Sequence, residues 1–197
     1  MLITKDVSKI VPLLAARSGT VIAYPTETFY GLGSAITDHE GIERIIRIKG
    51  RDAAKGMIVL AVDLASAREI AEIGGSQESL IKHFWPGPLS AVFPARPGIH
   101  SLLAPQGKVA LRVSPHPMAL ALTRIAGPIT STSANPSGMQ PARTPREVAA
   151  WNLDIDAILD GGETPGGMPS TLVDLTVWPP KLLREGVIPF SSILKDL

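Results

Sequence analysis

Short apolar runs, each about as long as a buried β-strand, recur along the chain between stretches of helical periodicity. The run Met57–Val62 is continuously apolar, which favours a central strand that is covered on both faces. The runs that predict strands are 20–24, 57–62, 89–93, 109–113, 129–132, 157–159, 170–175 and 181–184.

Three of the helical stretches begin with residues that cap helix N-termini: Asp38, Asp63 and Thr144. Thr144 is followed by Pro145 and Glu147 in the pattern of a capping box. The helix after Asp63 is expected to run to residues 74–75. Further helices are predicted over 8–18, over 76–84 and from residue 115. Because Pro12 lies inside the first of these, that helix either begins only a few residues earlier or is kinked.

Helices and strands interleave irregularly, which predicts an α/β fold with a mixed sheet. The sequence contains no internal repeat, linker or low-complexity tract, so we expect one domain over residues 1–197. Apolar residues make up 45% and charged residues 19%, a balance typical of globular domains. The N-terminus lacks the pattern of a signal peptide, and no apolar run approaches the ~20 residues that span a bilayer. A cytoplasmic protein is expected.

Polar residues gather directly after three predicted strands. Pro25–Gly33 is rich in hydroxyls and glycines and contains the carboxylate of Glu27; Ser131–Gly138 and Pro169–Thr171 have a similar character. Polar groups at the ends of buried strands often form a site, although Pro and Gly also punctuate ordinary loops. The recurrence of this pattern favours a site. Glu27 is the only carboxylate in these loops, and we do not assign it as a general base.

Composition excludes several classes of chemistry. The chain has no cysteine, so disulfides, thiolate metal sites and a cysteine nucleophile are excluded. Its four histidines show no metal-ligand spacing. The sequence also lacks a Walker motif, a G-x-G-x-x-G motif after a strand and a G-x-S-x-G elbow. A nucleotide, if bound, is held by other means.

The 19 basic and 18 acidic residues leave a net charge of +1, and aromatic residues make up 5%. Both values argue against a dedicated nucleic-acid-binding domain, which usually carries a strong basic excess and stacking aromatics. Lys49, Arg51 and Lys55 form a small cationic cluster. These cations either complement a solvated helix end or clamp a phosphate.

Two further arginines lie within predicted strands. Arg112 is embedded in an apolar strand, where a charge is costly unless it is paired or faces water. A carboxylate or phosphate partner fits it equally well, and Arg184 repeats the pattern. Ser131, Ser133 and Asn135 either satisfy a turn or form a concavity that holds an anion.

Seven segments occur in an order that resembles the YrdC/Sua5 family, and within it the single-domain threonylcarbamoyl-AMP synthases. They are Pro25-Thr26-Glu27-Thr28-x-Tyr30-Gly31-Leu32-Gly33, Lys49-x-Arg51, Trp85-Pro86-Gly87-Pro88, Val109–Val113, Thr132-Ser133-Ala134-Asn135-x-Ser137-Gly138, Pro169-Ser170-Thr171 and Leu183-Arg184-x-Gly186. The resemblance extends from about Gly19 to Gly186.

The resemblance implies a twisted open mixed sheet with flanking helices and a large, positively lined cavity. It implies that L-threonine, bicarbonate and ATP, accompanied by Mg²⁺, give threonylcarbamoyl-AMP and pyrophosphate. A separate threonylcarbamoyl transferase then modifies an adenosine in tRNA. Direct tRNA contact is compatible with this role but not required by it, and no membrane is involved. The resemblance assigns neither a catalytic base nor a protein metal ligand.

The resemblance also assigns residues to the two substrates. The positions that match the family's threonine-binding residues are Thr26, Arg112, Ser131 and Ser170. Those that match its nucleotide contacts are Arg51, Lys55, Lys108, Ser133, Pro141 and Arg184, and the residue-level argument adds Lys49 and Asn135.

Some positions depart from the family pattern, and other functions stay open. Phe29 replaces a smaller aliphatic residue, while Lys55 and Leu60 replace an Asn and a His of longer members. The extra C-terminal domain of those members is not expected here, so residues 187–197 or the partner transferase would close the site. The alternatives are an RNA-binding or ribosome-maturation factor and a nucleotide sensor without turnover. A carbamoyl-transferring hydrogenase maturation protein is disfavoured because such proteins are much longer.

Overall fold

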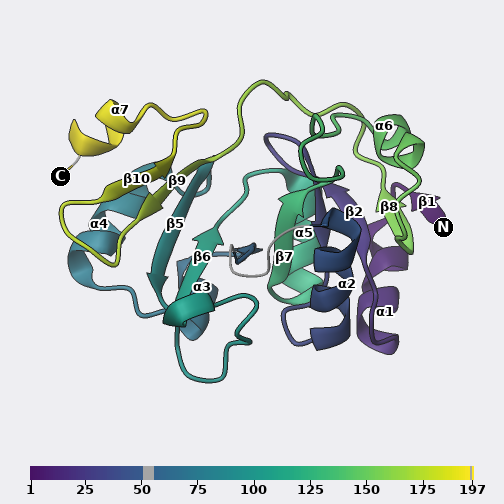
Figure 1. Ribbon diagram of the computed structural model, residues 1–197, viewed down its shortest axis with the longest axis horizontal. Helices are drawn as coiled ribbons and strands as arrows, with labels where there is room; N and C mark the ends of the chain where they lie inside the picture. The colour runs from purple at the N-terminus through teal and green to yellow at the C-terminus, as the bar shows by residue number, and fades with distance from the viewer. Residues whose placement is uncertain (51–55, 196) are drawn as a thin grey trace.

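Ten strands form one mixed sheet in this computed structural model, which describes residues 1–50, 56–195 and 197 (Figure 1). Parallel pairs such as β4–β6 and β5–β9 stand beside antiparallel pairs such as β2–β3 and β5–β6, so the predicted mixed sheet is confirmed. In spatial order the strands are β1 (Leu2–Thr4), β8 (Ala157–Leu159), β2 (Ile22–Pro25), β3 (Tyr30–Gly33), β7 (Ile129–Ser133), β4 (Ile58–Leu60), β6 (Lys108–Arg112), β5 (Leu89–Pro94), β9 (Thr171–Asp174) and β10 (Lys181–Arg184).

The helices divide between two hydrophobic cores. Helices α1 (Val7–Ala16) and α5 (Pro117–Ala126) pack on each other and on β2 and β8, where Ile10, Leu122 and Ile22 are fully buried. The larger core contains apolar residues from the other helices: α2 (His39–Lys49), α3 (Leu64–Ile70), α4 (Gly75–Phe84), α6 (Pro145–Ala150) and α7 (Phe190–Lys195). The short 3₁₀ turn η2 (Pro105–Gly107) precedes β6.

Side-chain alternation explains why one half of the sheet is left with an open face. In β6, Val109 and Leu111 belong to the larger core, whereas Lys108, Ala110 and Arg112 line a pocket on the opposite face. Successive side chains of a strand point to opposite faces, and the same alternation holds in β5 and β9. The uncovered face of strands β4, β6, β5 and β9 therefore forms the floor of the pocket.

Strand β3 is the main correction to the predicted elements, because residues 30–33 were expected to belong to a loop. Tyr30 and Leu32 are fully buried in the larger core and alternate with Gly31 and Gly33. A Cβ on Gly33 would lie 2.6 Å from the Tyr24 ring and 2.8 Å from the Thr130 carbonyl oxygen. These glycines are what lets β3 lie tightly between β2 and β7, although Gly in a sequence predicts a loop.

Other predicted elements are present with shifted ends. The helix capped by Asp63 ends at Ile70 rather than at Gly74, because Ala71 leaves it to form a bridge with Ala95. Helix α5 begins at Pro117 behind a His116 cap instead of at residue 115, and α1 begins at Val7 with Pro12 inside it. Strand β1 and helix α7 were not predicted. No helix in the described ranges has the length and hydropathy that a bilayer span requires.

Candidate active site

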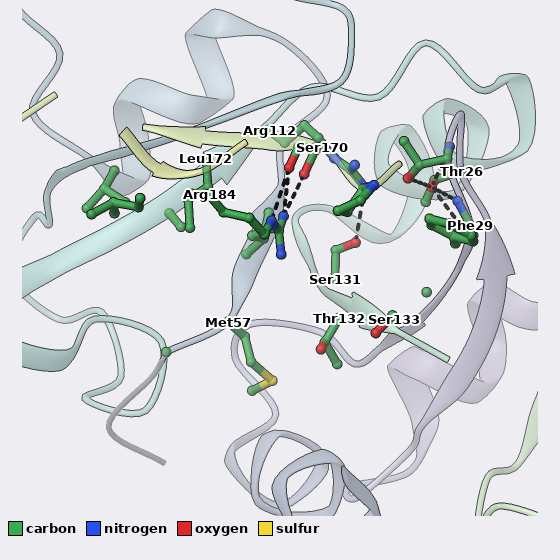
Figure 2. A pocket seen from close by; sticks show the side chains of 18 of the residues that line it. Thr26, Phe29, Met57, Arg112, Ser131, Thr132, Ser133, Ser170, Leu172 and Arg184 are labelled. Atoms are coloured by element: carbon green, nitrogen blue, oxygen red, sulfur yellow. Dashed lines mark hydrogen bonds between the residues drawn. The ribbon is translucent and has the colours of Figure 1, made fainter. Parts of the chain in front are cut away.

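A pocket of about 560 Å³ opens over the uncovered half of the sheet (Figure 2). Its walls come from the three polar loops noted in the sequence, and its floor comes from β4, β6, β5 and β9. Among the described residues that line it, Lys108, Arg112 and Arg184 are cationic and Asp174 is acidic. The described part of the lining therefore carries a net positive charge.

The turn between β2 and β3 presents two threonine hydroxyls to the pocket. The Thr26 and Thr28 hydroxyl oxygens lie 3.1 Å apart, and Thr26 Oγ1 also donates to the Phe29 carbonyl oxygen at 2.7 Å. Both side chains are buried and both line the pocket. The turn folds in this way because a threonine hydroxyl can bond to the backbone of the residues that follow it.

Arg112 stands at the end of β6 with its guanidinium almost completely buried. Its Nη1 lies 3.1 Å from Glu27 Oε1, and its Nη2 donates to Ser131 Oγ at 3.4 Å. Its Nε has no hydrogen-bond partner among the described residues. A buried cation needs a compensating charge, and Glu27 supplies it. Arg112 is thus a fixed cation in the pocket wall, beside the hydroxyl of Ser131.

Ser170, which directly precedes β9, links β5 to β10 through hydrogen bonds. Its hydroxyl oxygen lies 2.8 Å from that of Ser90, which is fully buried. Arg184 Nη2 donates to the Ser170 carbonyl oxygen at 2.8 Å and to Ser170 Oγ at 3.2 Å, as Figure 2 shows. Strand β10 thereby brings its arginine to the serine that precedes β9.

Lys49 lies behind the pocket wall and is not one of the described lining residues. Its buried ammonium donates to the Ser133 carbonyl oxygen at 2.6 Å, to the Asn135 carbonyl oxygen at 2.7 Å and to Asn135 Oδ1 at 2.8 Å. In this structure Lys49 thus holds the loop after β7, and its predicted contact with a phosphate stays a prediction. A buried lysine is tolerated where oxygen atoms surround its ammonium.

The far end of the floor holds a lysine and an aspartate. Lys108 Nζ lies 3.2 Å from Asp174 Oδ2, and the Asp174 carboxylate also accepts from the Thr176 N–H and hydroxyl. Burial opposes ionisation of Asp174, but the bonds from Thr176 and Lys108 outweigh it and keep the pKa of this carboxyl below its usual value. Ala110 lies between Lys108 and Arg112 on the same face of β6, so the backbone positions of the two residues are about 13 Å apart along the strand.

Tyr30 is a further wall residue whose protonation state is fixed by its surroundings. Burial raises the pKa of Tyr30 to about 12, so the phenol stays neutral in the physiological range. Its hydroxyl donates to the Gly162 carbonyl oxygen at 2.8 Å. Tyr30 therefore braces the wall and is not a candidate base.

The structure brings most of the predicted site residues together. The pocket is lined by Thr26, Lys108, Arg112, Ser131, Ser133, Asn135, Pro141, Ser170 and Arg184. Arg51 and Lys55 lie outside the described residues. Sequence reasoning missed Ser90, Ser114 and Asp174, because a single serine or aspartate in or after a strand carries no local signal. Only the order of the strands in the sheet places them beside Ser170, Glu27 and Lys108.

The described residues offer no ready-made metal centre. No group of three His, Asp or Glu side chains among them is arranged to hold a metal ion. Magnesium commonly keeps several waters and is bound through one or two carboxylates together with substrate phosphates. The donor set of this pocket, hydroxyls and cations around one carboxylate, fits an ion that arrives with a polyphosphate rather than a resident one.

Comparison with protein-family models identifies the family of this chain. The model for Sua5/YciO/YrdC proteins, described as "Telomere recombination", matches residues 15–186. The chain belongs to this family. The family assignment covers all the strands that form the pocket and all three polar loops.

Individual relatives agree with the assignment. The chain is 39% identical to the threonylcarbamoyl-AMP synthase of Pyrococcus abyssi over 91% of its own length and 54% of that protein. It is 40% identical to the threonylcarbamoyl-AMP synthase of Methylobacillus flagellatus over 81% of its length and 90% of that protein. The crystal structure of P. abyssi Sua5 complexed with L-threonine superposes with a TM-score of 0.91 at 36% identity, covering 100% of this chain and 61% of that one. The chain thus spans about half the length of the first relative.

Proposed function

We propose that this protein is a threonylcarbamoyl-AMP synthase, which makes threonylcarbamoyl-AMP and pyrophosphate from L-threonine, bicarbonate and ATP. Relatives that bear this name match most of the chain, and a family member has been crystallised with L-threonine. The observation that carries the proposal is the buried Arg112 guanidinium, which lines a pocket of small-molecule size beside several hydroxyls. A fixed cation among hydroxyls suits a hydroxylated amino acid.

The threonine end of the pocket would be formed by Thr26, Arg112, Ser131 and Ser170. The Arg112 guanidinium would pair with the substrate carboxylate. Its Nη2 makes only a long hydrogen bond of 3.4 Å to Ser131 Oγ, so it can also donate to a ligand. The hydroxyls would bond to the amine and the side-chain hydroxyl of the substrate. All four side chains are buried, so these bonds would be made away from bulk water.

The nucleotide would occupy the remainder of the pocket. Lys108 and Arg184 supply positive charge for its phosphates, with Ser133, Asn135 and Pro141 forming the wall beside them. Arg51 and Lys55, which lie outside the described residues, would add contacts as the family resemblance implies. Lys49 would act through the loop that it holds. The separation of Arg112 from Lys108 leaves room for two substrates in one cavity.

The chemistry would depend on position and charge. The threonine amine attacks the carbon of bicarbonate, water leaves, and a carbamate forms. A carbamate oxygen then attacks the α-phosphorus of ATP, the bond to the β-phosphate oxygen breaks, and pyrophosphate departs. Asp174 is the one acidic side chain among the described lining residues, and no histidine lines the described wall. We therefore propose that this chain contributes orientation and stabilisation of negative charge, without a covalent intermediate.

Magnesium and the downstream partner complete the proposal. We propose that Mg²⁺ enters with ATP, since the phosphates rather than a protein cluster would hold it. The threonylcarbamoyl group would pass to a tRNA-modifying transferase. Because ATP and tRNA meet in the cytoplasm, we place the reaction there.

The direct test is pyrophosphate release from Mg-ATP by the purified protein, with threonine or bicarbonate omitted in turn. Release that requires both is expected. Tight ATP binding without release would instead favour a nucleotide sensor. A steep salt dependence of RNA affinity, with no release, would favour an RNA-binding factor.

A further inference from the structure

Glu27 has a position that the proposed reaction leaves unexplained. It stands between Thr26 and Thr28, whose side chains both line the pocket, yet Glu27 is not among the described lining residues. Its carboxylate is mostly buried and contacts protein groups on both oxygens: Oε2 accepts a hydrogen bond from the Ser114 hydroxyl, and Oε1 lies 3.1 Å from Arg112 Nη1. A carboxylate committed in this way cannot act as a general base on a substrate in the pocket.

The contact joins two segments that the sheet keeps apart. Glu27 lies in the turn between β2 and β3, while Arg112 ends β6, and strands β7 and β4 stand between β3 and β6. Ser114 is in turn fixed to the start of α5, because its hydroxyl accepts from the His116 N–H at 3.2 Å. The Glu27 carboxylate is therefore anchored by a hydrogen bond on Oε2, while Oε1 faces the arginine in an ion pair without hydrogen-bond geometry.

We propose that Glu27, anchored by Ser114, is a positioning residue that holds the Arg112 guanidinium in the orientation in which it receives the carboxylate of the amino-acid substrate. The inference rests on the proposed function for the identity of that substrate. The inference adds a second role to the turn between β2 and β3. Thr26 and Thr28 line the pocket, and Glu27, which stands between them, contacts Arg112. Without Glu27, Arg112 would keep only the long bond to Ser131 among the partners that fix its guanidinium nitrogens in the described structure.

Enzyme kinetics separate this role from general support of the fold. Truncation in Glu27→Ala is expected to raise the KM for threonine about tenfold or more, because a small displacement of a positioning group has large effects. The KM for ATP should stay within about twofold, since Lys108 and Arg184 lie elsewhere in the pocket. Glu27→Gln, which keeps the shape but not the charge that compensates Arg112, should raise the threonine KM by less than Glu27→Ala. Ser114→Ala should raise the threonine KM alone and by less than Glu27→Ala.

A second measurement requires no substrate and keeps the test valid if Glu27→Ala is poorly stable. In protein with ¹⁵N-labelled arginine, the Arg112 Nε–H resonance, assigned from its absence in Arg112→Lys, should be sharp and slow to exchange because the atom is buried. In Glu27→Ala or Ser114→Ala it should broaden or exchange faster. Glu43→Ala is the matched control: that carboxylate is exposed on α2, 3.9 Å from Arg47.

The outcomes are distinguishable. An unchanged Arg112 resonance in Glu27→Ala would overturn the inference, and so would a parallel rise of both KM values. A different result is that Glu27→Ala loses the resonance while the wild-type protein neither binds nor turns over threonine. That result would overturn the proposed function and the threonine role. The hold of Glu27 on Arg112 would still be supported in that case.

Discussion

At the scale of single residues, each charged side chain of the site that the structure describes is held by polar or oppositely charged partners, and those of Arg112 and Lys49 are buried. Arg112 forms an ion pair with Glu27, and Lys108 forms one with Asp174. The Lys49 ammonium is surrounded by oxygen atoms of the loop after β7. Fixed charges of this kind stabilise developing charge without having to reorganise during the reaction. The position of each charged side chain depends on its partners. Substitution of a partner that does not line the pocket should therefore affect binding as strongly as substitution of a lining residue.

Lys49 gives a prediction of this type. Lys49→Met keeps the length of the side chain but leaves the buried oxygens of Ser133 and Asn135 without their donor. The free energy of unfolding should fall by about 3 kcal/mol, and the KM for ATP should rise as the loop loosens. Urea denaturation and initial rates check the two effects. Lys82→Met, which removes an exposed lysine of α4, should change neither; an equally small effect at Lys49 would contradict the supporting role.

At the scale of elements, one aspartate ties two segments together. Asp38 caps α2 through the Gly41 N–H, and its carboxylate also accepts from the Gly19 and Thr20 N–H groups in the turn before β2. Burial opposes ionisation of Asp38, but these hydrogen bonds outweigh it and lower the pKa of the carboxyl below 3.8. A cap visible in the sequence thus also sets the position of the strand that leads to the site.

Asp38→Ala should lower the free energy of unfolding at pH 7 by about 2 kcal/mol or more, because several N–H groups lose their acceptor. The folded pKa is depressed, so the contribution is complete above the ordinary value of 3.8 and is lost as the pH falls through the folded pKa. Wild type and variant should therefore converge in acid. Asp63→Ala removes a cap that, among the described residues, bonds only within its own helix, and it should cost about 1 kcal/mol. A difference at Asp38 that does not shrink below pH 4 would contradict this account.

Gly186 gives a second prediction about elements. A Cβ at this position would meet the Pro169 carbonyl oxygen and would lie 2.6 Å from both Ser170 C and Thr171 N. Gly186→Ala should therefore push the end of β10 away from Ser170 and stretch the bonds from Arg184. We expect lower stability and higher KM values for both substrates, measured by denaturation and steady-state kinetics. Gly75→Ala, in open space at the start of α4, should be neutral or slightly stabilising; equal behaviour of the two variants would rule out the close approach.

The elements also show what the sequence reveals and what it conceals. Apolar runs and cap residues predict the strands around Ile58 and Leu111 and the helices after Asp38 and Thr144, because these signals are local. Strand β3 is not predicted because glycines in a sequence indicate a loop. In the structure the same glycines are required by close packing against Tyr24. The three polar loops were identified as a site, but the partners Ser90, Ser114 and Asp174 were not. Their contacts depend on strand order, which no local pattern encodes.

At the scale of the whole molecule, helices cover one face of the sheet along most of its length, whereas the other face is covered over only one half (Figure 1). The exposed half is where β6 presents two cations separated by Ala110. Three loops that are distant in sequence close around this floor. An open sheet face with polar loops at its rim is a common way to form a small-molecule site. We therefore expect one cavity to join an amino acid to a nucleotide.

The most direct test of that claim is to incubate the protein with Mg-ATP, L-threonine and ¹³C-labelled bicarbonate and to identify the adenylate by mass spectrometry. The expected product is threonylcarbamoyl-AMP that carries the label, formed in equal amount with pyrophosphate and absent when threonine is omitted. Pyrophosphate released without a labelled adenylate, or an adenylate that forms without threonine, would contradict it.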